Sequence, residues 1–262
     1  GIVMGGGIGL MSGASHRVVS ERSKLAFPEI TVGLFPDVGG SWLLPRVPGH
    51  GGLFLALTGA PLNAGDAIYA GLADIHIAEA QRETVFNALA DVHWSREAKR
   101  NHEQLTALLQ QHASDAATGP LLRNAATVDA LCTGDDVGAI VEAILALETE
   151  DAWLKTAQAT LAAGAPGSAR LAFELQHLAE GASLAEVYRI EYVAALHAAA
   201  HGDFAEGIRA LLIDKDRTPK WQPRTLADAT AEWARTFFVS PWSDAAHPLA
   251  DLGATVPERS HA

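Results

Sequence analysis

The segment Met4–Arg46 decides the fold of this chain, and it reads MGGGIGLMSGASHRVVSERSKLAFPEITVGLFPDVGGSWLLPR. Its three glycines, Gly5, Gly6 and Gly7, follow the apolar residues Ile2–Met4. An apolar run followed by a glycine turn and small residues predicts a buried strand that leads into the N-terminus of a helix. The turn is interpreted either as a tight connection without a ligand or as part of an oxyanion hole, whose N–H groups stabilise negative charge on a carbonyl oxygen.

A glutamate follows the next two expected strands, which span residues 16–20 and 25–27 and are expected to be neighbours. Glu29 comes directly after Pro28, so its carboxyl group lies on a rigid loop. Apolar residues on both sides would raise its pKa toward the range of a general acid or base. The alternative is a first-turn glutamate that a helix dipole stabilises.

Asp37 lies eight residues after Glu29, before a glycine pair and the residues Ser41–Leu44, which read as the beginning of a helix. It is interpreted either as the N-cap of that helix or as a second carboxylate that faces the same cavity as Glu29. Two carboxylates close together push their pKa values apart, which provides one acid and one base near neutral pH.

Together these motifs resemble the enoyl-CoA hydratase/isomerase (crotonase) superfamily, and more closely its 3-hydroxyisobutyryl-CoA hydrolase branch. The branch pattern is carried by MGGGxGL at 4–10, PExxxGLFPDVGG at 28–40 and LPR at 44–46. Further matching motifs are LTG at 57–59, AGDA at 64–67, GLAD at 71–74, SLAEV at 183–187, EY at 191–192, DFAEGIRA at 203–210, DKD at 214–216 and PKW at 219–221. The resemblance covers the chain from residue 1 to about residue 225.

The resemblance implies roles for individual residues. The N–H of Gly6, between Gly5 and Gly7, would be an oxyanion donor, Glu29 would be the catalytic glutamate, and Asp37 would be the carboxylate typical of the hydrolase branch. A hydratase of the superfamily would carry a second glutamate two residues after the triple glycine, where this chain has Gly9. This difference argues against water addition by a two-glutamate mechanism.

The implied activity is hydrolysis of a 3-hydroxyacyl-CoA thioester, above all 3-hydroxyisobutyryl-CoA in valine catabolism, with release of CoA. Enoyl-CoA hydratase or isomerase activity and an inactive fragment of such an enzyme are the alternatives. CoA is part of the substrate, so no metal ion and no cofactor is expected. The basic residues Arg46, Lys215 and Lys220 are candidates for contacts with the CoA phosphates, against the alternative of solvated turns.

The same resemblance implies an α/β fold with a crotonase-like spiral core. In the family, further strands come before the position of residue 1, so we expect an N-terminally truncated core. Its open apolar edge at Ile2–Met4 would favour self-association into a homo-oligomer.

The pattern changes near residue 75, which divides the chain into core motifs (1–75), a helical region (76–239) and a loosely ordered tail (240–262). Helices are expected over residues 80–92, 97–112, 137–147, 151–161, 169–181, 183–201 and 204–212, with connections over 113–125 and 213–225. The eleven histidines are dispersed, and the pair His197 and His201 lacks the glutamate of a metalloprotease motif, so no metal site is expected.

Composition limits the remaining function classes. The net charge is −12, from 31 acidic and 19 basic residues, which argues against a nucleic-acid-binding surface. The single cysteine, Cys132, is expected to be a small buried residue and is compatible with a reducing compartment. No segment has the roughly 18 uncharged apolar residues of a membrane span. We therefore expect a cytoplasmic protein in a bacterium, or a protein of the mitochondrial matrix in a eukaryote.

Overall fold

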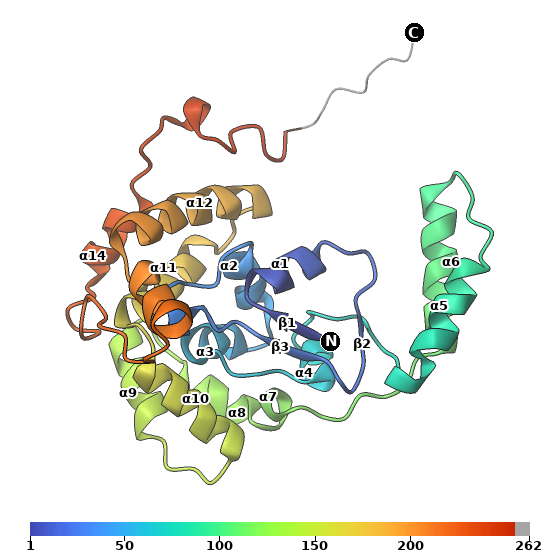
Figure 1. Cartoon of the computed structure of the whole chain (residues 1–262), viewed down its shortest axis with the longest axis horizontal. Helices are drawn as coiled ribbons and strands as arrows, with labels where there is room; N and C mark the ends of the chain where they lie inside the picture. The colour runs from blue at the N-terminus through green and yellow to red at the C-terminus, as the bar shows by residue number, and fades with distance from the viewer. Residues whose placement is uncertain (255–262) are drawn as a thin grey trace.

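Two small parallel sheets lie near the centre of the computed structural model, which describes residues 1–254 (Figure 1). Strand β1 (Ile2–Met4) pairs with β3 (Lys24–Ala26), and β2 (Val18–Val19) pairs with β4 (Ile75–His76). The expectation that the strands around residues 18 and 25 are neighbours is wrong, because they lie in different sheets. A local apolar pattern indicates a strand without specifying its partner, and here each partner is distant in the sequence.

Helices surround the sheets on most sides, and Figure 1 shows α9, α10, α11, α12 and α14 grouped together on one side of the strands. The helices are α1 (Gly6–Ser12), α2 (Gly40–Leu43), α3 (Gly51–Thr58), α4 (Ala64–Tyr69), α5 (Arg82–Ala90), α6 (Ala98–Gln111), α7 (Pro120–Arg123), α8 (Ala125–Leu131), α9 (Val137–Ala146), α10 (Ala152–Ala163), α11 (Pro166–Leu178), α12 (Leu184–His201), α13 (Phe204–Ile208) and α14 (Ala231–Arg235). Short 3-10 turns include η1 (Glu29–Val32) and η2 (Leu44–Arg46). The seven predicted helices are present within a few residues of their expected bounds, except that the last ends as α13 and continues as a π-helical turn, Arg209–Ile213.

The predicted connection over residues 113–125 is wrong in its second half, because it contains α7. The N-terminus of α7 is held from a distance by Asp66 of α4, whose carboxylate accepts hydrogen bonds from the backbone N–H groups of Leu121 and Leu122, both at 3.1 Å. A cap that comes from a residue more than 50 positions away leaves no signal in the local sequence.

One hydrophobic core extends across the predicted boundary near residue 75. It joins Ile8, Phe27 and Phe54 to Leu154 and Phe237, all of them buried. Helix α3 packs against both α10 and α11. The residues that carry the glycine turn and Glu29 are therefore packed directly on the helical region, while the division into domains stays a prediction.

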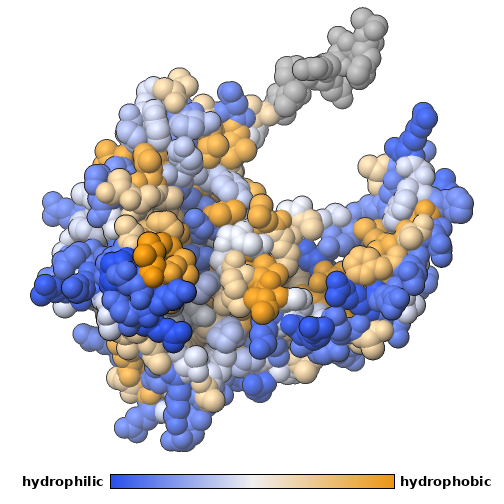
Figure 2. Space-filling view, viewed as in Figure 1, coloured by the Kyte–Doolittle hydropathy of each residue, from blue (hydrophilic) through white to orange (hydrophobic). Residues whose placement is uncertain are grey.

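Helices α5 and α6 form an arm that extends from the sheets and has its own small core of Ile77, Val85 and Leu109 (Figure 1). Between the arm and the strands lies a cavity of about 700 Å³ whose lining is mainly apolar. Figure 2 shows hydrophobic residues gathered along the arm and near the N-terminal strands.

The edge of the sheet at β1 is open to solvent, since Ile2 is 72% exposed. Self-association through this edge stays a prediction.

Residues 240–254 lie along α12. The guanidinium group of Arg189 donates hydrogen bonds to the carbonyl oxygens of Leu249, Ala250 and Leu252. Residues 255–262 of the predicted tail lie outside the described residues. Among residues 1–254, no helix combines the length and the hydropathy needed to cross a membrane.

Candidate functional site

The glycine turn connects β1 to α1, as the sequence predicts. Gly5 has a φ of 54° and its N–H donates to the carbonyl oxygen of Ala26 at 2.9 Å. The next two residues, Gly6 and Gly7, form the first turn of α1, where backbone N–H groups have no acceptor within the helix. A Cβ atom at Gly5 would lie 2.5 Å from Oε1 of Glu29. Glycine is thus required both by the backbone conformation and by the approach of this carboxyl group.

Glu29 is the first residue of η1 and is only 6% exposed. Its Oε2 atom is buried and has no hydrogen-bond partner among residues 1–254. Burial raises the pKa of Glu29 to about 8, and the negative charges of Asp37 and Glu191 add to the increase. The predicted apolar setting is therefore confirmed, and Glu29 also occupies the first turn of a short helix. A carboxyl group with this pKa can exchange a proton near neutral pH.

The backbone around Glu29 is fixed on several sides. Gly33 ends η1 with a φ of 73°, and a Cβ atom there would overlap the carbonyl group of Asp203, just before α13. From the helical region, the N–H of Ala165 donates to the carbonyl oxygen of Ile30 at 3.0 Å. The Glu29 side chain therefore extends from a rigid support, as the loop after Pro28 predicts.

Asp37, like Glu29, lies close to the glycine turn. A Cβ atom on Gly6 would lie 3.7 Å from Oδ1 of Asp37, and the charge of Asp37 contributes to the raised pKa of Glu29. Asp37 is not the N-cap of the following helix, because α2 begins at Gly40 with Gly39 as its cap. Partial burial raises the pKa of Asp37 as well. The two carboxyl groups and the glycine turn form one site.

Val38, directly after Asp37, has a φ of 53°, which is a rare conformation for a β-branched residue and costs about 1 to 3 kcal/mol. Two side chains of α12 hold this turn. The carboxylate of Glu191 accepts hydrogen bonds from the N–H groups of Gly39 at 2.7 Å and Ser41 at 2.9 Å. The hydroxyl of Tyr188 donates to the carbonyl oxygen of Val38 at 3.3 Å.

Sequence reasoning missed the part that Glu191 and Tyr188 take in the site. Glu191 appeared only as part of a family motif, about 150 residues after the turn that it holds. The available signal was a glutamate at a helix position flanked by Val187 and Ala194, both buried, which places its carboxylate in the interior.

Gly9 of α1 lies against the backbone of Val38. A Cβ atom at this position would overlap the Val38 carbonyl oxygen. The space that a glutamate would need is therefore occupied by the strained turn that carries Asp37.

The three basic candidates lie in two separate parts of the chain, η2 and the segment after α13. Arg46 stacks on the ring of Trp42, with 3.5 Å between the guanidinium carbon and the ring centroid, and borders a cavity of about 470 Å³ that Gly9, Val38 and Tyr188 also line. Lys215 and Lys220 are exposed on the segment that follows α13. The site geometry does not bring these side chains to Glu29, so their role in binding phosphates stays a prediction.

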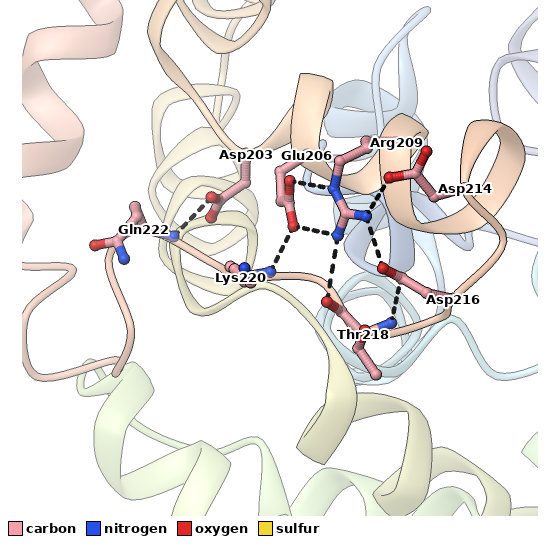
Figure 3. A network of polar contacts seen from close by, with 8 residues as sticks. All are labelled: Asp203, Glu206, Arg209, Asp214, Asp216, Thr218, Lys220 and Gln222. Atoms are coloured by element: carbon pink, nitrogen blue, oxygen red, sulfur yellow. Dashed lines mark hydrogen bonds and ion pairs between the residues drawn. The ribbon is translucent and has the colours of Figure 1, made fainter.

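Hydrogen bonds from Arg209 hold the segment that carries Lys215 and Lys220 (Figure 3). Its guanidinium group donates to the carboxylates of Glu206, Asp214 and Asp216, each at 2.7 or 2.8 Å. Hydrogen bonds from Arg209 hold the pKa of Glu206 at about 2. Since α13 also packs against η1, this network supports the element that bears Glu29.

The potential metal ligands and the single cysteine are further candidate sites among the described residues. Residues 1–254 contain no cluster of three or more His, Cys, Asp or Glu side chains that could hold a metal ion. Cys132 is 1% exposed, which confirms the interpretation of this cysteine as a buried residue, and its burial raises the pKa of the thiol to about 12.

The raised pKa of Glu29 predicts a pH-dependent effect on stability. The pKa in the folded chain, about 8, lies above the ordinary value of 4.5, so folding favours the protonated form. The corresponding stability is fully present below pH 4.5 and is lost as the pH rises through 8. Glutamine carries no charge, so Glu29→Gln should raise the free energy of unfolding by about 2 to 4 kcal/mol above pH 8 and leave it unchanged at low pH. Urea unfolding of both proteins at two pH values measures this, and an equal difference at both would contradict the pKa.

Comparisons with known proteins identify relatives of this chain. A family model described as enoyl-CoA hydratase/isomerase matches residues 1–238. The curated relatives include the mitochondrial 3-hydroxyisobutyryl-CoA hydrolases of Danio rerio, 38% identical, and Homo sapiens, 32% identical, with 92% of this chain and 62% of each relative covered. The chain therefore spans about 62% of the length of these curated relatives.

Two solved structures are similar as well. A structure described as an enoyl-CoA hydratase from Rhodobacter sphaeroides has a TM-score of 0.78 at 34% identity, over 92% of this chain and 66% of that one. A structure described as a carnitinyl-CoA dehydratase from Mycobacterium thermoresistibile has a TM-score of 0.79 at 34% identity, over 91% of this chain and 65% of that one. Together with the family match, these likenesses confirm the predicted crotonase-like α/β fold.

Proposed function

Because the chain belongs to the enoyl-CoA hydratase/isomerase family, we propose that it hydrolyses the thioester of a 3-hydroxyacyl-CoA. The substrate that we propose is 3-hydroxyisobutyryl-CoA of valine catabolism, and the products are 3-hydroxyisobutyrate and CoA. The names of the curated relatives support this choice. The observation that carries the proposal is the buried Glu29 carboxyl group, which lies beside the glycine turn and Asp37 with one oxygen free of hydrogen bonds within residues 1–254.

The proposed reaction uses the site as follows. The N–H of Gly6 donates to the thioester oxygen and stabilises the negative charge that develops there. Ionised Glu29 takes a proton from water, the resulting hydroxide attacks the carbonyl carbon, and the C–S bond breaks. The proton on Glu29 then passes to the departing CoA thiolate. Asp37 orients the 3-hydroxyl group or the attacking water.

A covalent route uses the same residues. Glu29 would attack the carbonyl carbon itself and release the CoA thiolate, and water would then hydrolyse the acyl-glutamyl anhydride. A single turnover in oxygen-18 water distinguishes the two routes, because only hydrolysis of the anhydride at its glutamyl carbonyl places the label in the protein.

Hydration of an enoyl-CoA is the alternative, and the similarity to a structure described as an enoyl-CoA hydratase supports it. The two-glutamate mechanism needs a second glutamate at the position of Gly9. The Val38 carbonyl oxygen would overlap the Cβ atom of that residue, which favours hydrolysis.

We further propose that Arg46, Lys215 and Lys220 contact the phosphates of CoA, and that the reaction takes place in a bacterial cytoplasm or a mitochondrial matrix. The mitochondrial names of the relatives support the second location. Exposure of both lysines supports their access to a ligand.

The test is a direct choice between two substrates. We expect the purified chain to release free thiol from 3-hydroxyisobutyryl-CoA and to leave the double bond of crotonyl-CoA intact. Thiol release and loss of the enoyl absorbance are followed in parallel. Hydration of crotonyl-CoA without thiol release from 3-hydroxyisobutyryl-CoA would favour the alternative, and inactivity toward both would contradict the proposal for this chain.

A further inference from the structure

A pair of side chains on α12 contacts the turn that carries Asp37. Tyr188 and Glu191 are three residues apart, so they lie on one face of the helix. Tyr188 donates to the carbonyl oxygen of Val38, and Glu191 accepts from the N–H groups of Gly39 and Ser41. The pair therefore binds both polar groups of the peptide that joins Val38 to Gly39, its carbonyl oxygen and its N–H.

Burial makes the Glu191 contacts strong and its position costly. The residue is 3% exposed, and burial raises the pKa of its carboxyl group to about 7, although the two N–H donors lower it. Burial of an ionisable carboxyl group costs free energy of folding, so its presence in the interior indicates a structural or functional role. Burial also raises the pKa of Tyr188, which keeps its hydroxyl protonated and able to donate.

These contacts hold Val38 in a strained conformation, and Val38 packs against the glycine turn and α1. Val38 occupies the left-handed region, its carbonyl oxygen lies against Gly9, and its side chain lies against Gly6. A relaxed Val38 would change the direction of the neighbouring Asp37 and its distance from the Gly6 N–H. Strain that the surroundings maintain at a site of this kind is typical of preorganisation.

We propose that Glu191, with Tyr188, is a positioning residue that holds the Asp37–Val38 turn in its strained conformation and thereby places the Asp37 carboxylate for the reaction. This inference rests on the proposed function for its kinetic consequences, while its structural consequences are independent of it. The hydrogen bonds of Glu191 go to Gly39 and Ser41, so its positioning effect is exerted through the Asp37–Val38 turn.

A purely structural cap of α2 would have different consequences. Loss of such a cap would lower stability and leave the kcat of the folded protein unchanged. A positioning residue that also contributes its charge affects both. The charged groups that act on the pKa of Glu29 are Asp37 from the turn and Glu191 from α12. Tyr188, the third group at this turn, is neutral at working pH.

The first experiment compares Glu191→Gln, Tyr188→Phe and a control, Glu142→Gln, which changes an exposed glutamate on α9. Glutamine can accept only one of the two hydrogen bonds, since its amide group faces the second N–H as a donor. We expect Glu191→Gln to lower kcat about tenfold or more with KM within about twofold, because a small displacement of a catalytic group costs this much. The ascending limb of its pH profile should also move to lower pH. Tyr188→Phe should lower kcat about three- to fivefold without moving the limb, and the control should match the original chain.

The second experiment needs no activity. Amide hydrogen exchange at Gly39 and Ser41, and the carbon-13 titration of the Glu29 carboxyl group, are measured by NMR in the same variants. In folded Glu191→Gln, faster exchange would show that the turn is held less tightly, and a lower Glu29 midpoint would show the loss of the Glu191 charge. Both results support the positioning role even if thiol release is absent, and absent thiol release would reject only the proposed function. Unchanged exchange and an unchanged midpoint would overturn the inference, as would an unaltered kcat and pH profile.

Discussion

Glu29→Gln is expected to lower kcat for thiol release by a factor of about 100 or more with a smaller effect on KM. A general base supplies roughly 10² to 10⁴ in rate, and glutamine keeps the size of the side chain without the basic oxygen. Initial rates with 3-hydroxyisobutyryl-CoA, with unfolding curves as a check on the fold, measure the effect. A loss below about tenfold would remove Glu29 from the mechanism.

Asp37→Asn provides the partner measurement for the same prediction. The charge of Asp37 acts on the pKa of Glu29, and both carboxyl groups lie beside the glycine turn. Residues that act as a unit give losses that do not add. The double variant Glu29→Gln with Asp37→Asn should therefore lose little more activity than Glu29→Gln alone. Strictly additive losses would contradict a coupled pair.

Gly9→Ala should have the second large effect. The added Cβ atom would overlap the Val38 carbonyl oxygen, and neither backbone can yield without moving α1 or the Asp37 turn. We expect a loss of about 2 to 3 kcal/mol in the free energy of unfolding, as for overpacked interiors. We also expect a fall of about 100-fold in kcat, as for a displaced catalytic group.

Gly13→Ala, at the C-cap of α1, is the matched control. Its φ is −74°, and a Cβ atom there would meet only ordinary contacts. Urea unfolding and thiol release are measured on both variants. A Gly9→Ala protein with the stability and rate of the Gly13→Ala protein would show that the close approach of Val38 is not required.

Local patterns in the sequence predicted much of the site. The strand, glycine turn and helix at residues 2–12 follow from an apolar run and three glycines, and the burial of Glu29 follows from its apolar neighbours. The helices α5, α6 and α9 to α12 follow from apolar periodicity. These features depend on residues close together in the chain.

The features that the sequence did not reveal depend on distant contacts. Strand β3 pairs with β1 instead of β2, α7 is capped by Asp66, and the Asp37 turn is held by Glu191. Asp37 also resembled an N-cap, because an aspartate before a short helix has the same local pattern in either role. The left-handed conformation of Val38 had no signal at all, since valine rarely adopts it.

The pH dependence of thiol release, measured beside the carbon-13 titration of the Glu29 carboxyl group, tests the central claim most directly. If ionised Glu29 drives the hydrolysis, the rate should rise with pH, about tenfold per unit well below the pKa, and level off near 8, where the carboxyl signal should titrate. A rate that stays level across this range, or a Glu29 signal that titrates near its ordinary value of 4.5, would contradict the account.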